Sequence, residues 1–374
     1  MKKVLILQLL GNSYGGIWQV NKLVGEELIK NNYQVTILNL RDNKNNLCVE
    51  HDERLTIDTI NKIDEWNYPL KSDLLKLKIS IFDYFKRMKK VKNDYKNMAQ
   101  YIYNYKPDYI IVSHYLLLNA IPNEYLKRTI YQQHSSFEYA FSQRGNMRTL
   151  LRFNNKVNFL WLSNASCERA KKNGLNNCYY IYNAVRFDSN KRANVINNKK
   201  IVTIARLSYE KRIDLMINIV NDIFCNNLSL KDWTFEIYGS GDLESKLKKI
   251  DYDKKRIKFM GITNDPKKVL LSSSINLNTS LFEGFSLSIL EANECGIPTV
   301  SFEFGESANE QILNNKTGII AKDENEYKQK LLDLMINNDK LDNMSKECKK
   351  YNESFKIGMI INDWLKLFHD IDCK

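Results

Sequence analysis

Short apolar runs rich in β-branched residues alternate along this chain with longer amphipathic stretches. Buried strands of a parallel sheet show such near-continuous apolar runs, and helices on the faces of the sheet show a period of 3.6 residues. The first half of the chain has one amphipathic stretch, at 20–31, and five strand-like runs, at 4–9, 34–40, 109–113, 129–133 and 159–163. This half therefore predicts an α/β domain built on a parallel sheet.

The pattern starts again after a polar stretch at 188–200, which we interpret as a linker. The second half has helical stretches at 215–225, 287–295 and 327–337 and strand-like runs at 200–205, 233–238, 256–260, 275–278 and 299–302. A chain of 374 residues is long enough for two domains, at roughly 100–200 residues each. We therefore expect two Rossmann-like α/β domains, at 1–186 and 187–355.

Composition excludes several classes of protein. An apolar share of 43% suits globular cores, and only 14 Gly and 5 Pro exclude collagen-like and low-complexity chains. No apolar run approaches the roughly 18 residues of a spanning helix, and the apolar run after Met1 is interrupted by Gln8 and lacks a cleavage site. The 7 Cys are scattered without a CxxC pair, which argues against a disulfide framework or a zinc site and predicts a cytoplasmic protein.

The excess of basic residues indicates an acidic partner. The formal net charge is +12, so nucleic acid, anionic lipid and a phosphorylated substrate are all compatible with the composition. In the segment 73–96, apolar residues at helical spacing are mixed with eight Lys and Arg. A basic amphipathic helix of this kind binds anionic membrane surfaces, whereas an ordinary packed helix with a solvated basic face gives the same pattern. The pattern slightly favours the ordinary helix, and both alternatives stay open.

Two basic residues follow the first strand-like run of the second half. Arg206 lies at the carboxyl end of the run 200–205, and Lys211 comes five residues later, near the start of a helix. Ligands of parallel α/β sheets bind outside the carboxyl ends of the strands. An Arg fork and a Lys point charge at this edge would suit a single diphosphate, although two solvated cations are the simpler alternative.

Two carboxylates flank the start of the helical stretch 287–295. Glu283 precedes it and Glu291 lies on it, eight residues further along. Carboxylates accept charge-assisted hydrogen bonds from sugar and ribose hydroxyls, and the backbone N–H groups of 285–287, at the start of this helix, suit a phosphate. Surface positions would be the default for each Glu taken alone.

His134 and Gly16 occupy comparable places in the first half. His134 follows the strand-like run 129–133, and Gly16 follows the first run and opens a helix, where a glycine lets backbone approach a phosphate. Neither Gly15–Gly16 nor Gly239–Gly241 completes a GxGxxG fingerprint, which weakens a dinucleotide-binding interpretation. Asp251 and Asp253 form an acid-x-acid triplet in a Lys-rich stretch, which we interpret as a solvated turn, so we expect no metal and no other cofactor.

Taken together, these motifs resemble the retaining glycosyltransferases of the GT-B fold, family GT4. The resemblance extends over almost the whole chain and is most specific between Arg206 and Gly318. It is carried by the glycine pair, Tyr33–Val35, His134, Ile181–Asn183, Arg206 with Lys211, Tyr238–Gly241, Phe259–Gly261, Glu283-x7-Glu291 and Trp364 in the last helix. The implied fold is two Rossmann-like domains that face a central cleft, with a C-terminal helix (356–374) that returns to the first domain.

The resemblance also implies roles for individual residues. Arg206 and Lys211 would hold the diphosphate of a nucleotide-diphosphate sugar, and Glu291 the ribose hydroxyls. Glu283 and His134 would contact the donor sugar near the reacting carbon. The remaining donor-binding positions would be Gly16 and the backbone of Phe285, Ser286 and Leu287 around the phosphates and sugar, with Gly239 and Ile262 around the base.

The implied activity is transfer of a hexosyl unit, with retention and usually an α-linkage, to a hydroxyl of a cell-surface glycan precursor. Surface polysaccharides such as capsule or lipopolysaccharide are the usual products of such enzymes. The acceptor would be a lipid-linked oligosaccharide or a polyol-phosphate polymer, reached at the inner face of the plasma membrane, and UDP is the commonest donor nucleotide among relatives. Ser286 and Ala184 stand where the family often has Gly. A nucleic-acid-binding protein, which we do not expect, and a sugar phosphorylase of the same fold are the alternatives.

Overall fold

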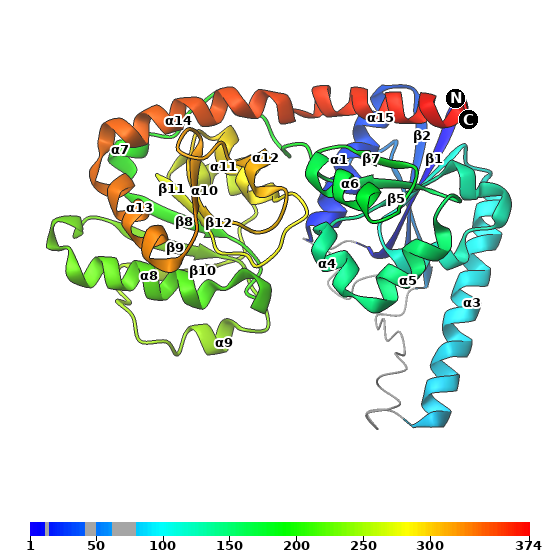
Figure 1. The fold of residues 1–374 in the computed structure, drawn as a ribbon, viewed down its shortest axis with the longest axis horizontal. Helices are drawn as coiled ribbons and strands as arrows, with labels where there is room; N and C mark the ends of the chain where they lie inside the picture. The colour runs from blue at the N-terminus through cyan, green and yellow to red at the C-terminus, as the bar shows by residue number, and fades with distance from the viewer. Residues whose placement is uncertain (12–14, 42–49, 62–79) are drawn as a thin grey trace.

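The computed structural model describes residues 1–11, 15–41, 50–61 and 80–374. Two parallel sheets lie side by side in it, each with helices on both faces (Figure 1). The first sheet has the strand order β3-β2-β1-β4-β5-β6-β7 and the second has the order β10-β9-β8-β11-β12-β13. Both orders reverse direction at a central strand, which places a ligand-binding crevice at the carboxyl ends of the strands around β1 and β8.

The first domain contains the following elements. Its strands are β1 Lys2–Leu10, β2 Tyr33–Arg41, β3 Thr56–Asn61, β4 Tyr109–Val112, β5 Thr129–Gln132, β6 Asn158–Trp161 and β7 Cys178–Tyr180. Its helices are α1 Gly16–Lys30, α3 Ile81–Tyr105, α4 Phe137–Ser142, α5 Arg144–Phe153 and α6 Asn164–Lys172, with 3₁₀ turns η1 Tyr115–Ala120 and η2 Asn123–Arg128.

The second domain is built in the same way. Its strands are β8 Lys200–Ile204, β9 Thr234–Tyr238, β10 Ile257–Gly261, β11 Ile275–Asn278, β12 Thr299–Phe302 and β13 Gly318–Ala321. Its helices are α7 Val195–Asn198, α8 Ile213–Asn226, α9 Glu244–Leu247, α10 Pro266–Leu271, α11 Leu287–Glu294, α12 Ala308–Gln311, α13 Glu324–Ile336 and α14 Asn338–Asn352. The 3₁₀ turns η3 Tyr209–Lys211, η4 Leu228–Leu230 and η5 Glu353–Phe355 complete it, and α15 Ile357–Asp372 follows.

The predicted α/β architecture of two parallel sheets is confirmed. All ten predicted strands are present within two residues of their expected bounds, because each central strand is covered on both faces and is apolar along its length. In β1, Val4 pairs with Val35 of β2 on one side and Tyr109 of β4 on the other, and its side chain is fully buried. The domain bounds at 186 and 355 stay predictions.

Two expected segments differ in detail from the structure. The predicted linker at 188–200 contains the short helix α7 and ends at the first residue of β8. The predicted basic helix at 73–96 begins at Ile81 in the described residues and continues to Tyr105, while 73–79 lie outside them. Ser80 caps α3 by accepting a hydrogen bond from the backbone N–H of Asp83, which fixes the start of the helix.

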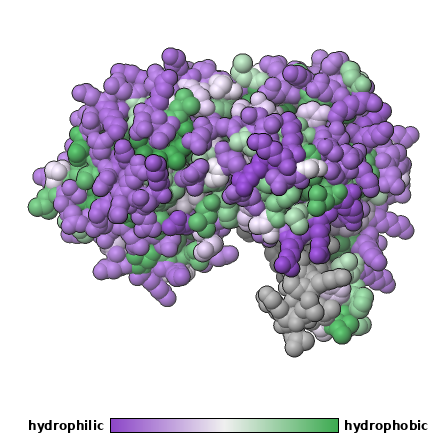
Figure 2. All heavy atoms as spheres, viewed as in Figure 1, coloured by the Kyte–Doolittle hydropathy of each residue, from purple (hydrophilic) through white to green (hydrophobic). Residues whose placement is uncertain are grey.

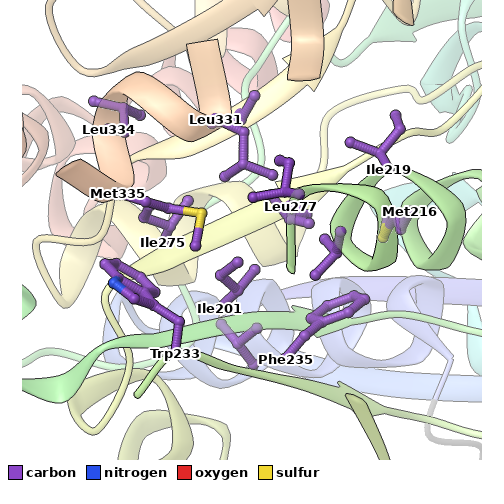
Figure 3. Close-up of a cluster of buried hydrophobic side chains, with 14 of the residues drawn as sticks. Ile201, Met216, Ile219, Trp233, Phe235, Ile275, Leu277, Leu331, Leu334 and Met335 are labelled. Atoms are coloured by element: carbon purple, nitrogen blue, oxygen red, sulfur yellow. The ribbon is translucent and has the colours of Figure 1, made fainter. Parts of the chain in front are cut away.

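The core of the second domain lies between its sheet and the helices α8 and α13 (Figure 3). Ile201 of β8 and Leu277 of β11 point from the sheet toward Leu331 of α13, and Met216 comes from α8. These side chains are 2% exposed or less. Burial of each large apolar side chain contributes about 1.5–3 kcal/mol, so this packing holds the strand ends that bear the site residues in fixed positions.

Helix α15 returns across the molecule and packs on the first domain (Figure 1). Trp364 and Phe368 lie in the same buried cluster as Val24 of α1. The Phe368 ring stacks on Tyr109 of β4 at 4.1 Å between centroids, with an angle of 9° between the planes. The chain therefore crosses between the two domains twice, before α7 and again after α14.

The first ten residues of α3 stand away from the first domain (Figure 1). None of them is buried, and Phe82 and Phe85 are 76% and 65% exposed. Further along, Met98 and Ile102 are fully buried against the sheet. The packed-helix alternative therefore describes only the second half of α3. In the part of the chain that the structure describes, no helix is long and apolar enough to cross a membrane.

Candidate active site

The predicted second-domain residues gather at the carboxyl ends of β8, β9 and β11. Arg206 follows β8, and its side chain is 72% exposed with one guanidinium nitrogen 3.9 Å from a carboxylate oxygen of Glu210. Lys211 ends the 3₁₀ turn η3, and its ammonium donates a hydrogen bond to Oε1 of Glu283. Oε1 of Glu283 also accepts from the Ser280 hydroxyl at 2.7 Å. A solvent-accessible cation therefore lies beside a half-buried ion pair.

The loop after β11 brings Glu283 to Lys211, which is 72 residues away in sequence. The Thr279 hydroxyl donates to the backbone oxygen of Lys211 at 2.7 Å, and the Leu281 N–H donates to the backbone oxygen of Glu210 at 2.8 Å. These backbone contacts fix the loop against η3. The ion pair is therefore an outcome of how the two loops dock.

Glu291 is placed differently from the other predicted residues. It lies on α11 and is only 1% exposed, because the Nε of Arg186 donates to its Oε1 and the side chain is covered. Arg186 lies just before the second domain, and its side chain is 25% exposed. Arg186 therefore holds the Glu291 carboxylate in a fixed position.

The start of α11 was predicted to offer backbone N–H groups. The Ser286 N–H instead donates to Oε1 of Gln311 at 2.8 Å, and Nε2 of Gln311 donates back to the Ser286 oxygen at 2.9 Å. The Phe285 ring is buried, and its backbone oxygen accepts from the Asn183 side chain at 2.9 Å. In this arrangement Phe285 joins the second domain to Asn183, Ser286 is bonded within the second domain, and Leu287 is the half-buried member of the three.

The first domain meets this loop through His134 and Gly16. A Cβ on Gly284 would lie 2.3 Å from the backbone oxygen of His134, and a Cβ on Gly16 would lie 3.6 Å from Cδ1 of Leu287. The structure thus brings both predicted first-domain residues to the loop that carries Glu283. Nε2 of His134 is buried and has no hydrogen-bond partner within the described ranges.

Gly239 and Ile262 form the other end of the site. Gly239 has φ = +133°, and a Cβ there would lie 1.9 Å from the backbone oxygen of Ala205. Its N–H donates to the oxygen of Gly261 at 2.8 Å, which brings the ends of β8, β9 and β10 together. Ile262 and Met260 are exposed here. Only a glycine lets these three strand ends approach so closely.

Several residues at this site carry no recognisable sequence signal. Arg186 and Gln311 bond Glu291 and Ser286, and both lie in unremarkable polar stretches. Glu310 of α12 accepts from the backbone N–H groups of Asn164 and Ala165, at the start of α6 in the other domain, at 2.9 and 2.8 Å. It also accepts from the Tyr182 hydroxyl at 2.7 Å. These contacts join the domains beside the site and depend on tertiary packing alone.

The acid-x-acid triplet has a structural explanation. Oδ2 of Asp253 accepts from Nε of Arg256 at 2.6 Å, in the turn before β10. Over the residues that the structure describes, no group of three or more His, Cys, Asp or Glu side chains is arranged to hold a metal ion.

We expect Gly284→Ala to disrupt the contact between the loop and the first domain. The new methyl group would clash with the backbone oxygen of His134, so one of the two segments must shift, which costs on the order of 1–3 kcal/mol. Gly358→Ala is the matched control, since a Cβ there meets no atom within 4 Å. Urea unfolding compares the two variants, and equal stabilities would contradict the contact.

Stability is expected to fall between pH 6.5 and pH 4 because of two histidines. Burial lowers the pKa of His134 and of His114 from 6.5 to about 4. Below pH 6.5 the unfolded chain binds protons that the folded chain does not, so the free energy of unfolding falls by about 1.4 kcal/mol per pH unit for each histidine. Urea titrations at pH 5–7 would show a shallower slope for His134→Gln than for His369→Gln, which changes an exposed histidine. Equal slopes would contradict the burial of His134.

Comparisons with known proteins point to a class of enzyme. Residues 186–351 match the family model described as "Glycosyl transferases group 1". An "Uncharacterized glycosyltransferase" of Haemophilus influenzae is 26% identical over 97% of this chain and 99% of its own. The poly(ribitol-phosphate) alpha-N-acetylglucosaminyltransferase of Staphylococcus aureus is 31% identical, over 44% of this chain and 34% of its own length.

A crystal structure of Staphylococcus aureus TarM, described as a mutant in complex with fondaparinux, alpha-GlcNAc-glycerol and UDP, has the same fold. The TM-score is 0.79 at 16% identity, over 98% of this chain and 100% of that one. The family match covers the domain that holds Arg206, Lys211, Glu283 and Glu291. Taken with the full-length relative, these findings identify the chain as a glycosyltransferase of the GT-B fold.

Proposed function

We propose that this glycosyltransferase, of the GT4 type, moves a hexosyl unit from a nucleotide-diphosphate sugar, with UDP as the nucleotide, to a hydroxyl of a surface-glycan precursor. The observation that carries the proposal is the group formed by Arg206, Lys211 and Glu283 at the carboxyl ends of the second sheet. Two cations at a single sheet edge match a diphosphate, and Glu283 beside Lys211 suits the sugar joined to it. TarM, which has this fold, was crystallised with UDP.

The chemistry follows from where charge develops. Cleavage of the bond between the sugar and the diphosphate leaves negative charge on the diphosphate, which fixed cations stabilise. Arg206 is free to fork two phosphate oxygens, and Lys211 supplies a second charge from a position fixed by Glu283. His134 is neutral at pH 7, because burial lowers its pKa to about 4, and a neutral imidazole can hydrogen-bond a sugar hydroxyl.

Retention of configuration and an α-linkage are part of the same proposal. Glu283 and Glu291, the carboxylates that the proposal places at the donor, are both bonded to basic side chains. A same-face reaction, in which the acceptor hydroxyl attacks beside the leaving diphosphate, requires no covalent carboxylate intermediate. Gly16 lies against Leu287 and would approach the diphosphate from the first domain. Gly239 and Ile262 would lie beside the base, and Glu291 beside the ribose.

A thermal-shift panel tests the donor. UDP, GDP, ADP and CMP are each added at high concentration, and a nucleotide at 100 times its Kd stabilises the fold by about 2.7 kcal/mol. For a chain of this size we expect a shift of roughly a few degrees with UDP only. Glu291→Gln should abolish the shift, while Glu347→Gln, on the far helix α14, should keep it. The absence of any shift with every nucleotide would overturn the proposal and favour the nucleic-acid alternative.

We also propose that the enzyme works on the cytoplasmic face of the membrane and touches it through α3. The exposed apolar side chains of Ile81, Phe82 and Phe85 lie at the free end of this helix (Figure 2). A shallow basic hollow, formed by Lys86, Lys89, Lys90, Lys92, Asn93 and Lys96, follows directly. Apolar residues beside a Lys cluster match the boundary between acyl chains and anionic headgroups.

Vesicle binding tests this membrane contact. Phe82→Ser with Phe85→Ser should weaken binding to anionic vesicles about tenfold or more, because the substitutions remove the two exposed aromatic rings that would insert into the membrane. Leu228→Ser is the control, since Leu228 is exposed on the other domain. Sedimentation with vesicles that contain phosphatidylglycerol measures the effect. Equal binding of the wild type to neutral and anionic vesicles would remove the membrane from the proposal.

A further inference from the structure

A row of arginines covers the outer face of α5. Arg144, Arg148 and Arg152 recur every four residues and are all exposed, whereas Leu150 and Phe153 are buried in a hydrophobic cluster of the first domain. At 1.5 Å per residue, neighbouring arginines lie about 6 Å apart along the helix axis. The row is therefore a regular line of positive charge fixed to a packed helix.

Two of these arginines have no partner among the described residues. Arg144 and Arg148 form no hydrogen bond or ion pair there, and α5 itself contains no acidic residue. By contrast, Arg169 and Arg192 are bonded to carboxylates. Arg152 donates to the side-chain oxygen of Asn119 and lies over the Phe153 ring at 4.8 Å. The guanidinium groups of Arg144 and Arg148 are thus available to an anion from outside.

The row begins close to the candidate active site. His134 is followed by Ser136, which caps α4 by accepting from the Tyr139 N–H at 3.3 Å. The Tyr139 ring stacks on Phe282 of the other domain at 4.0 Å between centroids, and Phe282 precedes Glu283. Helix α5 follows α4 directly and packs against it (Figure 1). An extended molecule that reached the site past Tyr139 would therefore continue along the arginines.

The far end of the row leads toward α3. The 3₁₀ turn η1 packs against both α5 and α3, so it lies between the two basic helices. The basic hollow on α3 starts at Lys86. Both basic surfaces are therefore carried by helices of the first domain that pack against η1.

We propose that the arginine row of α5 binds consecutive phosphate groups of the acceptor, a polyol chain joined by phosphodiesters. This inference rests on the proposed function and names the acceptor class of that site. Arginine forks match phosphate oxygens with two parallel hydrogen bonds, which lysines do not. A single exposed pair binds weakly, but consecutive pairs on one chain act together, so the row selects a repeating anion over a lone phosphate. With its phosphates bound along the row, the acceptor would place a hydroxyl near His134.

Binding of a synthetic glycerol-phosphate oligomer tests the inference. In isothermal titration calorimetry, Arg144→Gln with Arg148→Gln should raise the Kd about fivefold, the loss that two exposed charge pairs account for. Lys254→Gln with Lys255→Gln removes the same charge from an exposed turn of the other domain and should change the Kd by less than twofold. A change below twofold for the arginine pair would overturn the inference.

Additional binding measurements distinguish a polyol-phosphate acceptor from nucleic acid and from the membrane surface. The single variant Arg148→Lys keeps the charge but loses the fork, and we expect it to raise the Kd measurably. The oligomer should bind more tightly than an oligonucleotide of equal charge, and the arginine pair should leave vesicle binding unchanged. Tighter oligonucleotide binding, or loss of vesicle binding, would overturn the assignment to the acceptor. The UDP shift is independent of the row, so its absence alongside oligomer binding would refute the donor but not the row.

Discussion

Lys211→Ala is expected to lower kcat/KM by about 10²–10³-fold, the loss seen when one fixed group that stabilises developing negative charge is removed. The ammonium of Lys211 is held by Glu283, so it need not reorganise as the diphosphate leaves. Arg206 does not replace it, because that side chain is 72% exposed and no partly buried carboxylate among the described residues fixes it as Glu283 fixes Lys211. The loss should appear mainly in kcat, since the charge develops during the reaction.

Steady-state transfer assays with the donor that the thermal panel selects would measure this effect. Lys316→Ala is the matched control, because Lys316 also pairs with a glutamate of the second domain, Glu347, but away from the sheet edge. Glu283→Gln and the double variant complete a cycle. We expect the loss of transition-state stabilisation in the double variant to be no larger than the sum of the losses in the two single variants. The reason is that the two side chains act as a unit. A decrease below tenfold for Lys211→Ala would exclude it from the reaction.

Glu291→Gln is expected to reduce stability as well as nucleotide binding. The substitution keeps the shape of the side chain but leaves Arg186 without its counter-charge. Loss of one partner of a fully buried ion pair costs about 3–5 kcal/mol, and Arg186 is a quarter exposed, so we expect about 2 kcal/mol. Urea unfolding measures this cost, and the nucleotide panel measures the binding.

A second substitution separates the two effects. Arg186→Met in the Glu291→Gln background removes the unpaired charge, so most of the stability should return. Nucleotide binding should stay lost, because the carboxylate is still missing. Recovery of both properties would show that Glu291 only positions Arg186, and recovery of neither would show that the pair does not explain the stability of this region.

The sequence predicted the central strands of both sheets and the edge strand β10, but it missed the other three edge strands, β3, β7 and β13. β1 and β8 are covered on both faces, so they are apolar along their length and easily recognised. β3 is a half-exposed edge strand with polar residues such as Asp58 and Asn61, and β7 has only three residues. Neither gives a periodic signal long enough to separate it from a loop.

The residue types of the candidate site were predictable, but their pairings were not. Lys211 and Glu283 were each recognised from a place at a strand end, yet their contact depends on how the loop after β11 docks on η3. Arg186 and Gln311 have no motif, and they act through Glu291 and Ser286. The expectation of free N–H groups at the start of α11 ignored such partners. Local sequence indicates where strands end, whereas tertiary packing determines which polar groups at those ends remain without a protein partner.

The return of α15 to the first domain also constrains the order in which the chain folds during synthesis. Trp364 and Phe368 complete the apolar cluster around α1, yet a ribosome makes them about 180 residues after the rest of that domain. At 5–20 residues per second this interval lasts roughly 10–40 s. Throughout it, the face of α1 and Tyr109 that α15 later covers remains open to chaperones. The first domain is therefore the first to be translated and the last to be finished.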